Sequence, residues 1–211
     1  MAEFSQLVAW SDYAKLLLGL FAVSTPLAAV PIYLSLTEGL SHTDRLRVAY
    51  VVAVAYVVTL VAFTLTGEAL LGFFGITLPA FKVAGGLLLM VSAFRMLAVK
   101  SSAGAEPVAD GERSAVSIAV VPLAIPILAG PGAITTVMIF AHDHASWLHD
   151  LFMASVILVI AVVTWFLLRA ALAMGPLLGP AAVGIVHQVM ALVVASIGAE
   201  FLLEGVAEFL V

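Results

Sequence analysis

The first long apolar run of this chain contains the stretch STPLAAVP, residues 24–31, with prolines at Pro26 and Pro31. A proline inside a hydrophobic helix removes a backbone donor, and its ring clashes with the preceding turn. Two prolines five residues apart therefore predict a break where the helix should be most regular. What such a break is for depends on the kind of protein that contains it.

The composition of the chain indicates a membrane protein. Of its 211 residues, 64% are hydrophobic and only 10% are charged, and the mean hydropathy is +1.23. A soluble domain carries roughly 25% charged residues, so this chain has too little polar surface to coat a soluble globule. The net charge of −5 and the lack of a basic run argue against nucleic acid as a partner. Because there is no cysteine, disulfides, thiolate metal sites and cysteine nucleophiles are excluded.

Charged residues delimit six apolar segments, and a membrane-spanning helix needs about 20 apolar residues. The first is expected to be a retained helix and not a signal peptide, because Glu3 and Asp12 precede it. A polar stretch, KSSAGAEPVADGERS, separates the third segment from the fourth. We therefore predict an all-α polytopic membrane protein with two three-helix repeats, residues 1–100 and 115–211, joined by a polar cytoplasmic loop at 101–114. The segments are 15–38, 47–68, 78–99, 113–143, 150–169 and 184–209.

The basic residues predict the orientation, since positive charge favours the cytoplasmic side. With both termini outside, six basic residues fall on the cytoplasmic side and two on the outer side. The first group is Arg45, Arg47, Arg95, Lys100, Arg113 and Arg169, and the second is Lys15 and Lys82. We expect a multi-pass protein of the plasma (inner) membrane with both termini on its outer side.

A second stretch, AIPILAGP at residues 124–131, resembles the first at an offset of 100 residues. Pro26 then matches Pro126, and Pro31 matches Pro131. The third and sixth segments also compare, with 82–97 lying over 187–202. Because each half has three spans, the second half must enter the membrane from the opposite side. Such inverted repeats are typical of secondary transporters, whose sites lie near the midplane between discontinuous helices. The alternative is that the prolines are packing kinks, whose freed carbonyls neighbouring helices satisfy.

A helix broken at mid-membrane exposes amide donors on one side and carbonyls on the other, so it attracts anions and cations respectively. A zwitterionic amino acid offers both charges, and the small side chains around the breaks suit a small substrate. Nearby hydroxyls add polar contacts, unless they bond back to their own helix. The predicted substrate-binding residues are Ser24, Thr25, Pro26, Ala29, Pro31, Pro126, Ala129, Gly130, Pro131, Gly132, Thr135 and Thr136.

The charged and histidine residues give weaker signals. Glu200 lies inside the sixth segment, in the same half of the membrane as Lys82. We expect a pair between them, which would lower the cost of burying either charge; the alternative is that Glu200 carries a coupling ion or proton. A second group, His142, Asp143, His144, His149 and Asp150, has metal-ligand residue types, but nothing fixes their geometry, and we expect polar surface there. No metal, cofactor or catalytic pair is predicted, so the chain is not expected to be an enzyme.

Three segments resemble the MarC family of six-helix bacterial and archaeal membrane proteins, which includes neutral amino acid transporters. They are PLAAVPIYLSLTEGLS (26–41), FGITLPAFKVAGGLLLMVSAFRML (74–97) and VPLAIPILAGPGAITTV (121–137), whose AGPG core is the most distinctive. The resemblance implies two inverted three-helix halves and movement of small neutral amino acids such as glycine and alanine. Many members carry Asp or Asn immediately before the first proline, where this chain has Thr25. A carboxylate or amide there could hold a cation or an ammonium group.

Three hypotheses follow from the sequence. The first is a secondary transporter, importing or exporting small neutral amino acids with H⁺ or Na⁺ as a coupling ion. The second is a less selective channel-like or drug-efflux protein with the same architecture. The third is a membrane scaffold that uses the breaks only for packing. The expected partners are the lipid bilayer, the amino acid substrate, the coupling ion and a further copy of the chain in a homo-oligomer.

Overall fold

The structure, a computed structural model, describes residues 10–98, 128–142, 147–174 and 180–210, and all of its regular elements there are helices. Four of the described helices are long and apolar enough to cross a membrane: α4, α5, α8 and α9. The chain is therefore a polytopic α-helical membrane protein, as its composition predicts. The helices are α2 (Trp10–Ser24), α3 (Pro26–Leu36), α4 (His42–Phe74), α5 (Leu78–Ala98), α7 (Pro131–His142), α8 (Trp147–Met174) and α9 (Pro180–Leu210).

The ends of α4 show how the sequence sets the helix boundaries. At its start, the Ser41 side chain accepts a hydrogen bond from the Asp44 amide at 3.1 Å, and the Asp44 carboxylate lies in the first turn, where the helix dipole favours a negative charge. At its end, Gly75 has φ 66°, which glycine adopts without strain. The short turn at Gly75 then leads directly into α5.

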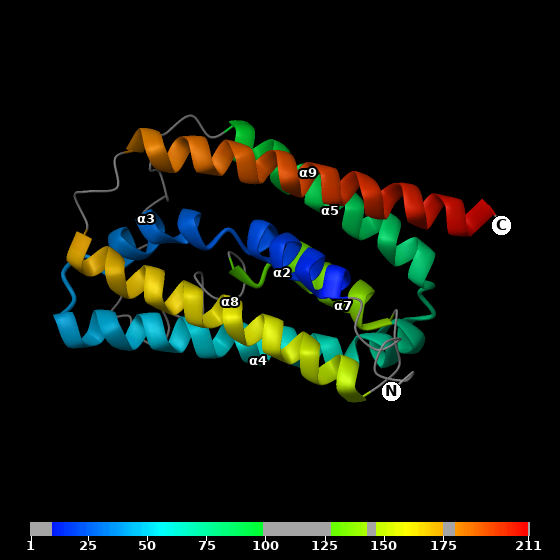
Figure 1. Ribbon diagram of the computed structural model, residues 1–211, viewed down its shortest axis with the longest axis horizontal. Coiled ribbons are helices and arrows are strands. Elements are labelled where there is room, and N and C mark those ends of the chain that lie inside the picture. The colour runs from blue at the N-terminus through cyan, green and yellow to red at the C-terminus, as the bar shows by residue number, and fades with distance from the viewer. Residues whose placement is uncertain (1–9, 99–127, 143–146, 175–179, 211) are drawn as a thin grey trace.

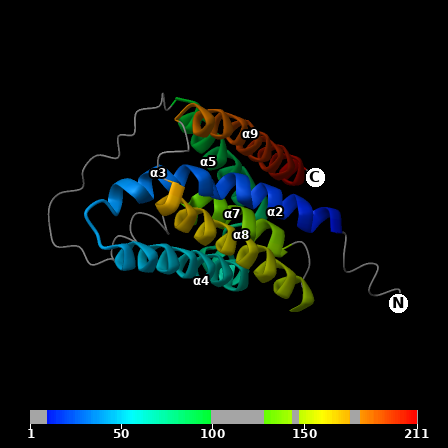
Figure 2. The ribbon, with the colours of Figure 1, turned by 60° about the vertical axis from the view of Figure 1, so that its left-hand side comes forward.

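The helices form three layers, which both views show (Figures 1 and 2). Helices α5 and α9 form one outer layer, α4 and α8 form the other, and the short helices α2, α3 and α7 lie between them. One buried apolar cluster joins the middle layer to α4 and α8, through residues such as Tyr33, Val52 and Ile157. A second joins it to α5 and α9, through Leu89 and Val194. The middle layer is thus covered on both faces.

Glycines bring the backbones of α5 and α9 together. A Cβ added to Gly86 would lie 2.4 Å from the Gly198 carbonyl oxygen, and one added to Gly205 would lie 2.6 Å from the Pro79 carbonyl oxygen. Small residues are the usual means of close helix packing in a membrane, where no hydrophobic force drives helices together. Large apolar side chains such as Phe166, which is 64% exposed, lie on the outside of the bundle, where lipid chains would cover them.

Each outer layer pairs a helix of the first half with one of the second, and the paired helices repeat at a common spacing. Helix α8 begins at Trp147, 105 residues after α4 begins at His42. Buried positions repeat at the same spacing, among them Val52 with Ile157 in α4 and α8 and Leu89 with Val194 in α5 and α9. Helix α2 begins and α9 ends at the same end of the bundle (Figure 1). The polar loop 101–114 lies outside the described residues, so the six-span count and the repeat boundaries stay predictions.

Candidate functional site

The first apolar segment is broken at Thr25, where STPLAAVP predicts a break. Helix α2 ends at Ser24, α3 begins at Pro26, and Thr25 between them has φ 42° and ψ 55°. This is the left-handed region, which a β-branched residue adopts only with strain. No other non-glycine residue in the described ranges has a positive φ. Pro31, in contrast, lies inside α3, which continues through it.

The break leaves backbone donors on one side and a carbonyl on the other. The first backbone hydrogen bond that closes a turn of α3 runs from the Ala29 amide to the Thr25 carbonyl, at 3.3 Å. The Leu27 and Ala28 amides precede it, so they have no partner within the helix, and Thr25 provides no side-chain cap. On the α2 side, the Ala22 carbonyl would be bonded by residue 26, but Pro26 has no N–H to donate.

The start of α7 has the same construction. Residues 128–130 lie outside the α-helix, α7 begins at Pro131, and the Ile134 amide bonds the Gly130 carbonyl at 3.1 Å. The two half-helix starts are therefore Pro26 and Pro131, which are 105 residues apart, the spacing also seen between α4 and α8. The offset of 100, which pairs Pro26 with Pro126 and Pro31 with Pro131, is not the pairing of the helix starts. Pro126 itself lies outside the described residues.

The two breaks lie against each other. A Cβ added to Gly132 would lie 3.0 Å from Val23 Cγ1 and 2.6 Å from Leu89 Cδ2, so the start of α7 contacts both the end of α2 and helix α5. This close packing is itself a reason for glycine at position 132, independent of any substrate. Of the predicted site residues, Ser24, Pro26, Ala29, Ala129, Gly132, Thr135 and Thr136 are buried, Thr25 and Gly130 are partly buried, and Pro131 is exposed.

The predicted hydroxyls point in different directions. Ser24 Oγ lies 2.8 Å from the hydroxyl of Tyr56 in α4, whereas Thr136 Oγ1 bonds back to the carbonyl of Gly132 in its own helix. Thr135 packs its methyl group against Gly85 of α5. The sequence reasoning missed Tyr56. A tyrosine in the centre of an apolar segment could have revealed it, because a buried tyrosine hydroxyl usually needs a hydrogen-bond partner.

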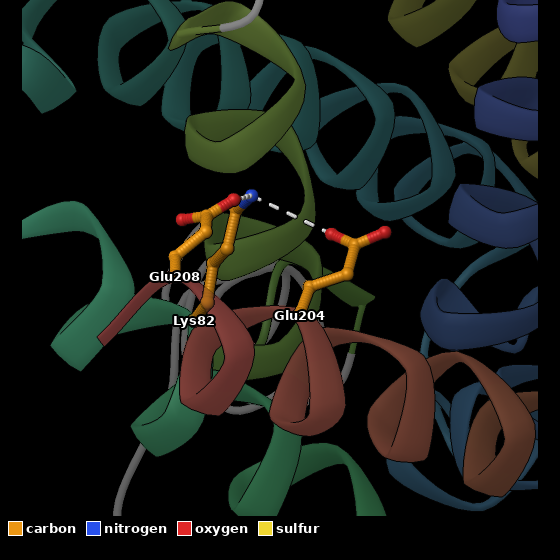
Figure 3. A network of polar contacts seen from close by, with 3 residues as sticks. All are labelled: Lys82, Glu204 and Glu208. Carbon is orange, nitrogen blue, oxygen red and sulfur yellow. Dashed lines mark hydrogen bonds and ion pairs between the residues drawn. The ribbon is translucent and has the colours of Figure 1, made fainter. Parts of the chain in front are cut away.

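The predicted pair between Lys82 and Glu200 is wrong. Lys82 Nζ lies 2.7 Å from Glu208 Oε1 and 3.4 Å from Glu204 Oε2, and Figure 3 shows the lysine between the two glutamates. Gly205 explains the difference, since its contact with the Pro79 carbonyl brings this part of α9 against the start of α5. Glu204 and Glu208 lie one turn apart on one face of α9. Glu200, a turn earlier, is exposed.

His149 is also not the surface residue that the sequence suggests. It is only 6% exposed, and its Nε2 lies 2.8 Å from the Phe140 carbonyl oxygen, while its Nδ1 lies 2.8 Å from the Tyr13 hydroxyl. A carbonyl can only accept, so Nε2 carries the proton. His149 thereby joins the start of α2, the end of α7 and the start of α8. Asp143 and His144 lie outside the described residues, and in the described part no group of three candidate metal ligands occurs.

Sequence comparisons relate this chain to one family of membrane proteins. The sequence model described as "MarC family integral membrane protein" matches residues 10–210. A UPF0056 membrane protein of Buchnera aphidicola (from Schizaphis graminum) is 32% identical, over 93% of this chain and 92% of its own length. One of Pyrococcus abyssi is 31% identical, over 92% and 94%, and YhcE of Escherichia coli is 29% identical, over 92% and 91%. No solved structure gives a significant match.

Proposed function

Because the chain belongs to the MarC family of integral membrane proteins, we propose that it is a secondary transporter of small neutral amino acids such as glycine and alanine. The observation that carries the proposal is the contact between the end of α2 and the start of α7, at the two breaks in the middle layer. Substrate would bind there near the midplane and reach either side by alternating access, for import or export. The proposal assigns no catalysis to the chain.

The arrangement of the helices supports an inverted repeat, which is the plan of many such transporters. In each layer a helix of the first half packs against a helix of the second half: α5 against α9, α4 against α8, and α2 against α7 (Figure 1). Buried positions recur at a spacing of 105 residues in both outer layers, and the half-helices begin at Pro26 and Pro131 with the same spacing. Alternating access would then move one outer pair relative to the other around the middle layer.

The chemistry of the breaks suits a zwitterion. The uncapped amides of Leu27 and Ala28 favour a carboxylate, and the Ala22 carbonyl, which Pro26 cannot bond, favours an ammonium group. The side chains of the breaks carry no charge, so they would balance no net charge on a substrate. The side chains at the breaks are themselves small, with buried alanines at positions 29, 129 and 133, and we expect a small substrate.

Flux measurements in liposomes test the proposal. Purified protein is reconstituted, and uptake and efflux of labelled alanine and glycine are measured with proton, sodium or no ion gradient. Saturable flux of either amino acid supports the transporter; absence of flux in both directions under every gradient refutes it. Flux that does not saturate, or that accepts large drugs equally well, would favour the channel-like or drug-efflux alternative.

A proline variant separates transport from a scaffold role. Pro131 is exposed, so Pro131→Ala removes little packing but restores an amide that lets α7 extend toward residue 130. We expect Pro131→Ala to remain folded and to have a much lower initial rate of alanine flux than the wild type. Pro79→Ala, in the first turn of the unbroken helix α5, is the matched control and should keep the flux. Gly132→Ala is a poor test, because its contacts with Val23 and Leu89 would be disturbed.

A further inference from the structure

A pair of buried hydroxyls lies at the point where the first segment breaks. Ser24 is the last residue of α2, and its Oγ lies 2.8 Å from the Tyr56 hydroxyl in the centre of α4. Both residues have no exposed surface. Thr25 and the start of α3 follow directly, so the phenol of Tyr56 reaches the gap between the two half-helices.

The hydrogen bond between the two hydroxyls leaves one donor hydrogen unused. Two hydroxyls carry two donor hydrogens, and the bond between them uses one. Within the described ranges, no other hydrogen bond is made by either side chain, so one donor has no acceptor there. Each hydroxyl oxygen has one partner, which is the usual minimum for a buried polar group. The remaining hydrogen is free to donate to a ligand at the helix break.

The fold itself does not require these hydroxyls. The positions that follow Ser24 and Tyr56 by 105 residues are Ala129 and Ala161, and both are buried. The positions at the same spacing in the second half are thus two buried alanines, which carry no hydroxyl.

We propose that Tyr56, together with Ser24, is a specificity-determining residue that donates a hydrogen bond to the carboxylate of the substrate. This inference rests on the proposed function. The Leu27 and Ala28 amides at the start of α3 are the other donors at the break, and a carboxylate, which only accepts, suits a group of three donors. The pair then selects amino acids against small amines and amides, which lack the carboxylate.

Tyr56→Phe removes the hydroxyl and keeps the ring, and Tyr50→Phe is the matched control. Tyr50 lies on the same helix but is 62% exposed on the outer surface of the bundle. The concentration dependence of labelled alanine flux gives the KM for alanine. Competition by alaninamide then measures how strongly the protein prefers alanine, which has the carboxylate, over alaninamide, which lacks it. We expect Tyr56→Phe to raise the KM for alanine about tenfold or more, as for a lost hydrogen bond to a charged group. Discrimination against alaninamide should fall by a similar factor, and Tyr50→Phe should match the wild type.

The outcomes separate the inference from the proposed function. If the wild-type protein moves no amino acid, both fail. If it transports alanine, and Tyr56→Phe has wild-type KM and wild-type discrimination, only the role of Tyr56 is refuted. Should Tyr56→Phe not fold, Ser24→Ala takes its place, since it removes the second hydroxyl of the pair and little volume. It should raise KM and reduce discrimination in the same direction, and unchanged values for it would overturn the inference.

Discussion

Replacing Thr25 with asparagine should stabilise the protein, because Thr25 is strained at the break between α2 and α3. Thr25 has φ 42° and makes no side-chain cap. The left-handed conformation costs an L-residue roughly 1–2 kcal/mol, and a β-branched side chain makes it worse. Asparagine is much more tolerant of this conformation, and its side chain can also cap the start of α3. We expect Thr25→Asn to raise the free energy of unfolding by about 1 kcal/mol.

The change is measured as a shift of the thermal midpoint in detergent. At the chain length of 211 residues, 1 kcal/mol corresponds to about 2–4 °C. Thr25→Gly should gain somewhat less, because the absence of strain is offset by about 0.5–1 kcal/mol of additional chain entropy in the unfolded state. Thr43→Asn is the control, since Thr43 is exposed in the first turn of α4 and its replacement should change little.

A lower midpoint for both Thr25→Asn and Thr25→Gly would refute the reasoning, because it would mean that the threonine side chain stabilises the break and is not strained by it. Aspartate and asparagine both tolerate the left-handed region, so the geometry of the break favours either residue at this position for a reason that does not depend on ion coupling.

Other predictions concern the remaining contacts. Lys82→Ala should destabilise the protein by about 1–3 kcal/mol. This is less than the loss of a fully buried pair, because the two carboxylates that contact Lys82 are half-exposed. Glu204→Gln should cost less, since Glu208 remains 2.7 Å from Lys82 Nζ. Gly86→Val should greatly reduce the yield of folded protein, because its Cβ would lie 2.4 Å from a backbone carbonyl of α9. Gly72→Ala, with nothing near its Cβ, should instead stabilise by about 0.5–1 kcal/mol. Thermal midpoints and size-exclusion profiles check all four, and equal effects of the two glycine variants would contradict the packing argument.

The sequence was sufficient for the membrane class, for four of the six predicted spans and for the break at Pro26, because these depend on local composition and on the chemistry of proline. It was not sufficient for the register between helices. Matching prolines by identity gives an offset of 100 residues, whereas the starts of α3 and α7, the starts of α4 and α8 and several buried positions repeat at 105. The match of 82–97 with 187–202 already has this offset of 105. The predicted pair between Glu200 and Lys82 is wrong for the same reason. The register of α9 against α5 is set by the contact of Gly205 with the Pro79 carbonyl.

Tyr56 shows a different limit of sequence reasoning. Its importance comes from a contact between residues 32 positions apart, and in the sequence it is one aromatic residue in an apolar helix. Ser24, in contrast, was singled out by its position next to the break. The structure adds that its partner lies in α4 and that the other predicted hydroxyls do not share this contact: Thr136 is bonded to its own helix, and Thr135 faces α5.

The two prolines of STPLAAVP have different consequences, and together they provide both kinds of hydrogen-bonding group. Pro26 begins a helix, so its lack of an N–H deprives the Ala22 carbonyl of a donor in α2. Pro31 lies inside α3 without breaking it, and in the same way it deprives the Leu27 carbonyl of its donor four residues ahead. The Ala22 carbonyl is thus freed at the end of α2, on the other side of Thr25 from the amides of Leu27 and Ala28, which the helix start leaves without intrahelical partners. Carbonyls inside a helix point toward its C-terminus, so the freed Leu27 carbonyl points along α3 away from the break. Pro26 therefore gives an acceptor and donors on the two sides of Thr25, which are the groups that an ammonium and a carboxylate on one carbon atom require, and Pro31 adds a second free acceptor within α3.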